Sequence, residues 1–186
     1  MKNKLIPFDA TPLPLEITVE SIFDSSQNLT VTYHLKGRID QIHLLDSSEE
    51  SSQIPAVRTH ELWKSTCFEW FLKSPTFKKY WEFNASPNGA WNFYSLDDYR
   101  THLQESTEAQ LEKRIQFQKI SQEEAKFFVE ISLQKLMNHS PELLKSNLFA
   151  ITAVIHWKSN LTSYFSLKHP QDKPDFHHQD GFILNL

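Results

Sequence analysis

The chain has 186 residues, a formal net charge of −4 and 13% aromatic residues, which is typical of one folded domain of ordinary size. The aromatic content excludes a disordered tail, and a total of three glycines leaves almost no material for a glycine-rich phosphate loop. Because the chain is acidic and its Lys and Arg residues are scattered, we expect no nucleic-acid partner.

The single cysteine, Cys67, excludes a disulfide within the chain and favours a reducing compartment. The first 16 residues lack the apolar run of a signal peptide. No stretch approaches the roughly 20 apolar residues of a membrane span. We therefore expect a cytoplasmic protein with no membrane partner. The sequence indicates no particular oligomeric state.

Alternation of apolar and polar residues predicts the strands in the first half of the chain. The all-polar run DSSEESSQ at 46–53 predicts a loop between them. Ser86-Pro87-Asn88-Gly89 predicts a tight hairpin turn. The predicted strands cover 29–35, 39–45 (the weakest), 66–72, 80–85 and 90–95.

The second half is expected to hold further strands and one or two short helices. The segment 103–116 predicts a short helix, and Ser140-Pro141-Glu142 predicts a helical turn with Ser140 as its N-cap. The remaining predicted strands cover 127–133, 148–157 (apolar and β-branched, as in a central strand), 162–168 and 182–186. Roughly nine or ten short strands indicate an all-β fold, an antiparallel, jelly-roll-like β-sandwich of two sheets, in a single domain over 1–186.

Polar side chains interrupt the aromatic strands at 66–72 and 80–85. Every second residue of a strand projects to the same side, so Glu82 and Asn84 share a side. Glu69 shares a side with Trp63 if its strand extends back that far. If the two strands lie in one sheet, a polar patch forms. Its expected members are Trp63, Glu69, Glu82 and Asn84, with Asn92 and Tyr94 as neighbours.

Such a patch has three interpretations. An aromatic ring beside carboxylate and amide groups suits a sugar, whose C–H face stacks on the ring while its hydroxyls form hydrogen bonds. Alternatively, Glu69 and Glu82 are a catalytic pair, since retaining glycosidases hold two carboxyls about 5–5.5 Å apart, close to the spacing of neighbouring strands. The third interpretation is a solvated sheet face, with the carboxylates paired to a base such as Arg58.

The segment 169–181, HPQDKPDFHHQDG, is rich in residue types that bind metals. It lacks a helical pair of histidines and a thiolate, and its two prolines indicate a loop. A turn capped by Asp and His side chains is the simpler interpretation. The residues concerned are His169, Asp172, Asp175, His177, His178 and Asp180.

Four stretches of the chain resemble the DOMON-like proteins, small bacterial proteins related to carbohydrate-binding module family 9. They are LWKSTCFEWFL (62–72), YWEFNASPNGAWNFY (80–94), FFVEISLQKLM (127–137) and SYFSLKHPQDKPDFHHQDGFILNL (163–186). The resemblance runs from about Asn28 to the end. It implies a jelly-roll-like sandwich with a ligand-binding rather than catalytic role. DOMON domains more widely are associated with sugar or haem.

The resemblance also implies roles for individual residues. Trp63 corresponds to the Trp that stacks on the sugar, Glu69 to a Glu that binds hydroxyls, and Asn84 to an Asn of the following strand. Glu82 stands where the family has Arg, which inverts the local charge. The second stacking Trp of the family has no clear match, although Phe176 lies in about that region, and the calcium sites of the family are not recognisable.

From these observations we expect a non-catalytic module that binds a small ligand, most plausibly a carbohydrate, on one sheet face and without a cofactor. The alternatives are a haem- or metal-binding redox domain, a glycoside hydrolase using Glu69 and Glu82, and a pure interaction module. Arg58 would hold the carboxylates ionised. The rim of the site would come from His169, Asp175 and His177.

Overall fold

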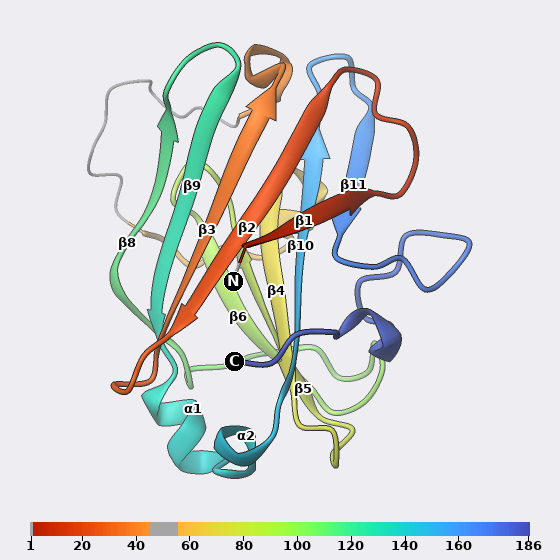
Figure 1. Ribbon diagram of the computed structural model, residues 1–186. Helices are drawn as coiled ribbons and strands as arrows, with labels where there is room; N and C mark the ends of the chain where they lie inside the picture. The colour runs from red at the N-terminus through yellow and green to blue at the C-terminus, as the bar shows by residue number, and fades with distance from the viewer. Residues whose placement is uncertain (1, 45–55) are drawn as a thin grey trace.

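The computed structural model describes residues 2–44 and 56–186. In this part of the chain, eleven strands form one antiparallel sheet in the order β7-β6-β5-β4-β10-β11-β1-β2-β3-β9-β8, which curls into a half-barrel (Figure 1). The strands are β1 (Lys2–Pro7), β2 (Leu15–Phe23), β3 (Asn28–Gly37), β4 (Cys67–Lys73), β5 (Tyr80–Ala85), β6 (Trp91–Leu96), β7 (Gln104–Glu105), β8 (Gln110–Lys119), β9 (Glu124–Ser132), β10 (Leu148–His156) and β11 (Thr162–Ser166), and the α-helices are α1 (Gln134–His139) and α2 (Glu142–Lys145).

Strand β1 joins the two halves of the sheet. Its first part pairs with β2, as Leu5 does with Ile17, and its last part pairs with β11, as Ile6 does with Ser166. The structure is therefore mostly β and antiparallel, as predicted, but it does not confirm two separate sheets. The two-sheet sandwich was predicted from local sequence patterns. Such patterns do not reveal that a single strand, β1, pairs with β2 on one side and with β11 on the other.

The core lies between the two halves. Phe68 of β4 stacks on Phe127 of β9 with ring centroids 4.4 Å apart, and the Tyr33 hydroxyl of β3 donates to the Glu69 carbonyl oxygen at 2.8 Å. Trp70 and Phe83, from neighbouring strands, stack at 5.1 Å. The alternating faces predicted for β4 and β5 are confirmed, because every second residue of each strand enters this core.

Most of the predicted strands are confirmed, and so is the hairpin turn between β5 and β6. Gly89 has a φ of 84° and its N–H donates to the Ser86 carbonyl oxygen at 3.0 Å. Glycine adopts this left-handed conformation without a steric penalty. The turn sets the register that places Asn84 opposite Asn92.

The segment 39–45 does not form the predicted strand. Ile39–Gln41 is a 3-10 turn, and Ile42 makes one isolated bridge to Trp157. Ile39 and Ile42 are both buried, so the apolar period here is three rather than two. That period fits a 3-10 turn, in which residues three apart lie on one side.

The helix predicted over 103–116 is also wrong, because the chain there forms β7 and most of β8. Strand β8 pairs with β9, but its register shifts between Leu111 and Ile115. Such a bulge interrupts the period of two and hides the strand from a pattern search.

The remaining differences concern ends of elements. Of the strand predicted over 182–186, Leu184 alone joins the sheet, through a bridge to Phe149. Helix α2 has Pro141 rather than Ser140 at its N-cap. Strands β1 and β2 and helix α1 have no counterpart among the predicted elements. The loop predicted at 46–53 lies outside the described residues.

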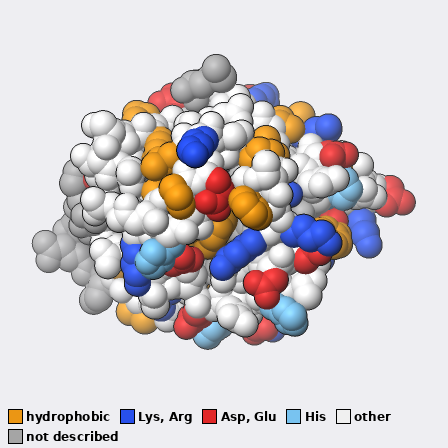
Figure 2. Space-filling view, turned by 90° about the horizontal axis from the view of Figure 1, so that it is seen from below, with side chains coloured by type: hydrophobic (Ala, Val, Ile, Leu, Met, Phe, Trp, Pro, Cys, Tyr) orange, Lys and Arg blue, Asp and Glu red, His pale blue; other side chains and the backbone are white. Residues whose placement is uncertain are grey.

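The surface shows no large region of one charge on the face that carries α1 and α2. Figure 2 shows basic, acidic and apolar side chains interspersed there. Within residues 2–44 and 56–186, no helix combines the length and the apolar character needed to cross a bilayer.

Candidate functional site

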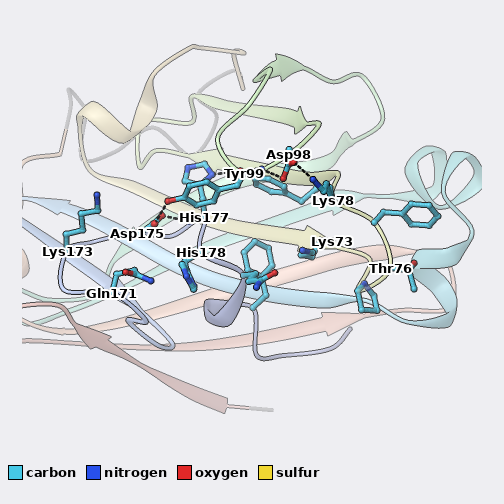
Figure 3. A pocket seen from close by; sticks show the side chains of 15 residues that line it. Lys73, Thr76, Lys78, Asp98, Tyr99, Gln171, Lys173, Asp175, His177 and His178 are labelled. Carbon is cyan, nitrogen blue, oxygen red and sulfur yellow. Dashed lines mark hydrogen bonds and ion pairs between the residues drawn. The ribbon is translucent and has the colours of Figure 1, made fainter.

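A pocket of about 650 Å³ opens where β4 ends and β5 begins. Three segments line it: residues 73–80 at the β4–β5 turn, residues 98–99 after β6, and residues 171–182 near the end of the chain (Figure 3). Two of the ten predicted site residues, Asp175 and His177, are among the lining residues. The pocket is therefore built mainly from turns, beside the sheet face on which the sequence placed the site.

Hydrogen bonds to Asp175 tie the last segment to the turn after β6. Its carboxylate accepts from the Tyr99 hydroxyl at 2.5 Å, from Arg100 Nη2 at 3.0 Å and from the His177 backbone N–H at 3.1 Å. Burial opposes ionisation of Asp175, but the hydrogen bonds from Tyr99 and Arg100 outweigh it and lower the pKa of this carboxyl. Asp175 is therefore an anchoring carboxylate, since both of its oxygens accept hydrogen bonds from the protein.

A second link holds the opposite wall. Lys78 Nζ lies 2.9 Å from Asp98 Oδ2, which connects the β4–β5 turn to the turn after β6. Both partners are largely exposed, so this pair adds little stability in water. The pair nevertheless means that the positive charge of Lys78 is balanced by Asp98.

His177 forms part of the floor. The Arg100 backbone N–H donates to the Tyr80 hydroxyl at 3.1 Å, and that hydroxyl lies 2.7 Å from His177 Nδ1. The other ring nitrogen, Nε2, lies 3.9 Å from Glu82 Oε2, so His177 links the pocket to that carboxyl. Burial, followed by the charge of Arg100, lowers the pKa of His177 to about 4, so this ring is neutral near pH 7.

Behind the floor lies the predicted polar patch, and its members do share one side of the sheet. Glu69 is paired directly with Asn84 and with Thr152, and Asn84 with Asn92. The patch does not meet water, however: Glu69 is 2%, Glu82 4% and Asn84 0% exposed. The expectation of an open binding face is therefore corrected.

Two segments close this face, one just before β4 and one near the end of the chain. Trp63 and Phe182 pack with Phe71 and Tyr94 on the outer side of the sheet, and Phe176 packs there too. Their apolar side chains replace the water that a single-layer sheet face would contact. The polar patch is consequently a buried cluster, defined here as Glu69, Glu82, Asn84 and Thr152.

Hydrogen bonding inside the buried cluster is incomplete. Asn84 Nδ2 donates to Glu82 Oε1 at 2.7 Å, and Thr152 Oγ1 donates to Glu69 Oε2 at 3.2 Å. Within the described residues, Glu69 Oε1 and Asn84 Oδ1 have no partner. Burial raises the pKa of both glutamates, and the charge of Glu82 raises that of Glu69 further. The two carboxyls together therefore retain a proton at pH values well above those at which carboxyls usually ionise.

Arg58 does not contact the two glutamates. Its Nη1 donates to Asn92 Oδ1 at 3.2 Å and to the Ser106 carbonyl oxygen at 2.9 Å, and its guanidinium lies 4.4 Å from the centre of the Trp91 ring. The predicted role of Arg58 is thus wrong. Arg100 is the base that acts on Glu82, whose pKa it lowers in opposition to burial.

The other predicted residues lie around the cluster rather than in the pocket. Trp63 packs edge-on to Tyr94 at 6.1 Å, and Asn92 Nδ2 donates to Glu105 Oε1 at 2.5 Å. Burial raises the pKa of Tyr94 to about 12. His169 Nε2 lies 2.8 Å from the Ile6 carbonyl oxygen, so this side chain ties the last segment to β1.

Sequence reasoning missed the residues that give the pocket its character. Phe77 and Tyr99 are 55% and 49% exposed, which is high for large apolar rings. The other two missed residues are Lys73 and Lys173, which bring positive charge to the pocket lining. All four lie in or next to turns, and no periodic pattern marks a residue there.

The alternatives raised by the sequence can be compared with this geometry. Both carboxyls of the suggested catalytic pair are at most 4% exposed, so neither can contact a glycoside in this conformation. In the part of the chain that the structure describes, no group of three or more His, Cys, Asp and Glu side chains is arranged to hold a metal ion.

Comparison with known proteins supports the fold. No protein-family model matches the sequence, and no curated protein matches it significantly. A solved structure from Bacteroides uniformis, named a "putative carbohydrate-binding protein", is similar, with a TM-score of 0.64 and 12% sequence identity. The match covers 98% of this chain and 84% of that one. At such identity the likeness establishes a shared β-rich fold.

Proposed function

We propose that this chain is a non-catalytic module that binds a carbohydrate in the pocket formed by the β4–β5 turn, the turn after β6 and residues 171–182. The observation that carries the proposal is the combination of two exposed aromatic rings, Phe77 and Tyr99, with polar side chains in one cavity. Its volume, about 650 Å³, is within the roughly 300–1,000 Å³ of small-molecule sites.

The chemistry of the lining suits a sugar. A pyranose ring presents an apolar C–H face that stacks on an aromatic ring and a rim of hydroxyls that form hydrogen bonds. Tyr99 and Phe77 would supply the apolar contact. Among the described residues, the side chains of Gln171 and Gln179 form no hydrogen bond with the protein, so both remain able to bind hydroxyls.

The wider family and the cellular location belong to the same proposal. The proposed relation to the DOMON-like proteins and carbohydrate-binding module family 9 rests on the four sequence stretches that resemble them, and the likeness to the Bacteroides uniformis protein supports the β-rich fold that this relation requires. The burial of Glu69 and Glu82 supports a role without catalysis. Cys67, a free and fully buried cysteine, is compatible with the cytoplasm.

Replacing Phe77 with alanine tests the pocket. We expect Phe77→Ala to weaken sugar binding about fivefold to tenfold, since an aromatic contact contributes roughly 0.5–1.5 kcal/mol beyond its area. Isothermal titration calorimetry with a panel of neutral monosaccharides and disaccharides would measure this. Leu161→Ala is the matched control, because Leu161 is 54% exposed and lies in the β10–β11 turn, outside the pocket lining. The absence of heat with every sugar, or equal effects of both variants, would refute the proposal.

A further inference from the structure

The pocket carries an excess of positive charge. Its lining includes three lysines, Lys73, Lys78 and Lys173, and two carboxylates, Asp98 and Asp175. Each carboxylate already has a cationic partner, since Asp98 pairs with Lys78 and Asp175 with Arg100, which is outside the lining. Two ammonium groups, those of Lys73 and Lys173, are therefore left without a carboxylate partner among the described residues.

The surroundings do not cancel this excess. Asp172 and Asp180 belong to the same segment as Lys173, but neither lines the pocket, and Asp180 Oδ2 lies 4.0 Å from His178 Nδ1. The pKa of Asp98 is lowered mainly by the hydrogen bonds from Lys78 and from the Tyr99 backbone. The charge of Lys73 adds a smaller effect in the same direction, so this charge acts on a group of the pocket lining. The chain as a whole carries a net charge of −4, so the positive pocket is a local feature rather than a general one.

The two free ammonium groups are not equivalent. Figure 3 shows Lys73 and Lys173 toward opposite ends of the pocket. Lys73 is the last residue of β4 and is partly buried, so its stem is held by the sheet, whereas Lys173 is exposed between two loop prolines. Fixing a long side chain costs conformational entropy, and that cost is smaller where the stem is already held. Lys73 is thus better placed than Lys173 to hold a charged group.

We propose that the pocket selects a carbohydrate that carries an anionic group, such as a carboxylate or a phosphate, with Lys73 as the direct partner of that group and with Lys173, toward the other end of the pocket, adding a weaker attraction at longer range. This inference rests on the proposed function and names the class of sugar. The aromatic rings Phe77 and Tyr99 hold the apolar face of the sugar. The ammonium of Lys73 donates to the anionic group, and such charge-assisted hydrogen bonds are stronger than those to a neutral hydroxyl.

The test compares neutral and anionic sugars of one skeleton. Calorimetric titrations use glucose, glucuronic acid and glucose 6-phosphate, with acetate and inorganic phosphate as simple ions. We expect at least one anionic sugar to bind about tenfold more tightly than glucose and than its simple ion, and to bind more weakly as salt rises from 50 to 500 mM. The two sugar acids distinguish a carboxylate from a phosphate as the preferred group.

Charge-neutralising variants locate the effect. Lys73→Gln should weaken binding of the anionic sugar about fivefold, and Lys173→Gln about twofold, while glucose affinity stays within a factor of two. Lys79→Gln is the matched control, since Lys79 lies in the same turn, with its ammonium 5.4 Å from the Trp81 ring and outside the pocket lining. Circular dichroism confirms that each variant is folded.

The outcomes separate the two proposals. Equal binding of glucose and both sugar acids, unchanged by Lys73→Gln, would overturn the selectivity and leave carbohydrate binding intact. Inorganic phosphate binding as tightly as glucose 6-phosphate would also overturn it, because the sugar ring would then contribute nothing. A lack of binding by all three sugars would overturn both proposals.

Discussion

Replacing Asp175 with alanine is expected to release residues 171–182 from the sheet and to lower the free energy of unfolding by about 2–3 kcal/mol. The carboxylate is almost completely buried and accepts three hydrogen bonds. Half of the Arg100 side chain is exposed, so the contribution of that ion pair is small. Most of the loss should come from Tyr99 and from the His177 N–H, both of which lose a charged acceptor.

Two measurements check this prediction. Urea denaturation gives the change in stability, and limited trypsin digestion reports whether cleavage after Lys168, at the start of the segment, becomes faster. Asp175→Asn should lose about half as much stability, because its amide oxygen still accepts one or two of the bonds. Asp172→Ala removes an exposed carboxylate from the same segment and should behave as the unmodified chain does. If Asp175→Ala keeps both its stability and its resistance to trypsin, Asp175 does not anchor the segment.

Glu69→Gln is expected to stabilise the protein increasingly as the pH rises above 5. In the folded chain the pKa of Glu69 is raised by burial and by Glu82, so the folded state keeps a proton that the unfolded state releases above its ordinary value of 4.5. That stability is present below pH 4.5 and is lost as the pH rises through the folded pKa. Glutamine cannot ionise and avoids the loss, which is at most about 1.4 kcal/mol per pH unit.

The hydrogen bonds of the cluster favour the same result. Glu69 Oε1 and Asn84 Oδ1 belong to directly paired residues and both lack a donor in the described part of the chain. The amide of a glutamine at position 69 can donate to Asn84 Oδ1, so one unsatisfied acceptor disappears.

The measurement is the difference in unfolding free energy between variant and parent at pH 5, 6, 7 and 8. His177 contributes in the opposite sense, since its pKa is lowered to about 4 and its stability is lost as the pH falls below 6.5. That contribution is common to both proteins and cancels in the difference. Glu123→Gln, at an exposed position in the β8–β9 turn, should show no trend within about 0.5 kcal/mol. A difference that is flat with pH would mean that Glu69 is ionised in the folded state.

Local patterns of the sequence predicted the sheet around the site well. Alternation in β4 and β5 places Glu69, Glu82 and Asn84 on one side, because the side-chain direction in a strand follows from position alone. The same reasoning found the β5–β6 turn, whose Asn-Gly pair has a specific conformation. These inferences succeed because each needs a few neighbouring residues.

The location of the site could not be predicted in this way. Whether Glu69 meets water depends on what covers the outer side of β4, where Phe176 and Phe182 pack from the end of the chain, about 110 residues further on. No periodic pattern reports such a contact. The rings Phe77 and Tyr99 lie in turns, where an exposed aromatic residue has the same sequence signature whether or not it borders a cavity. Strand β1 was missed for a similar reason, since Leu5 is its single buried residue.

The double pairing of β1 has a consequence for how the chain acquires its structure. Leu5 pairs with Ile17, which follows it closely in the chain. Ile6 pairs with Ser166, which the ribosome adds only after most of the chain, so this second pairing cannot form until late in synthesis. Closing so long a loop is entropically costly and slows folding. During synthesis, therefore, the strands from β2 to β9 can associate early, while the seam between β1 and β11 forms among the last steps.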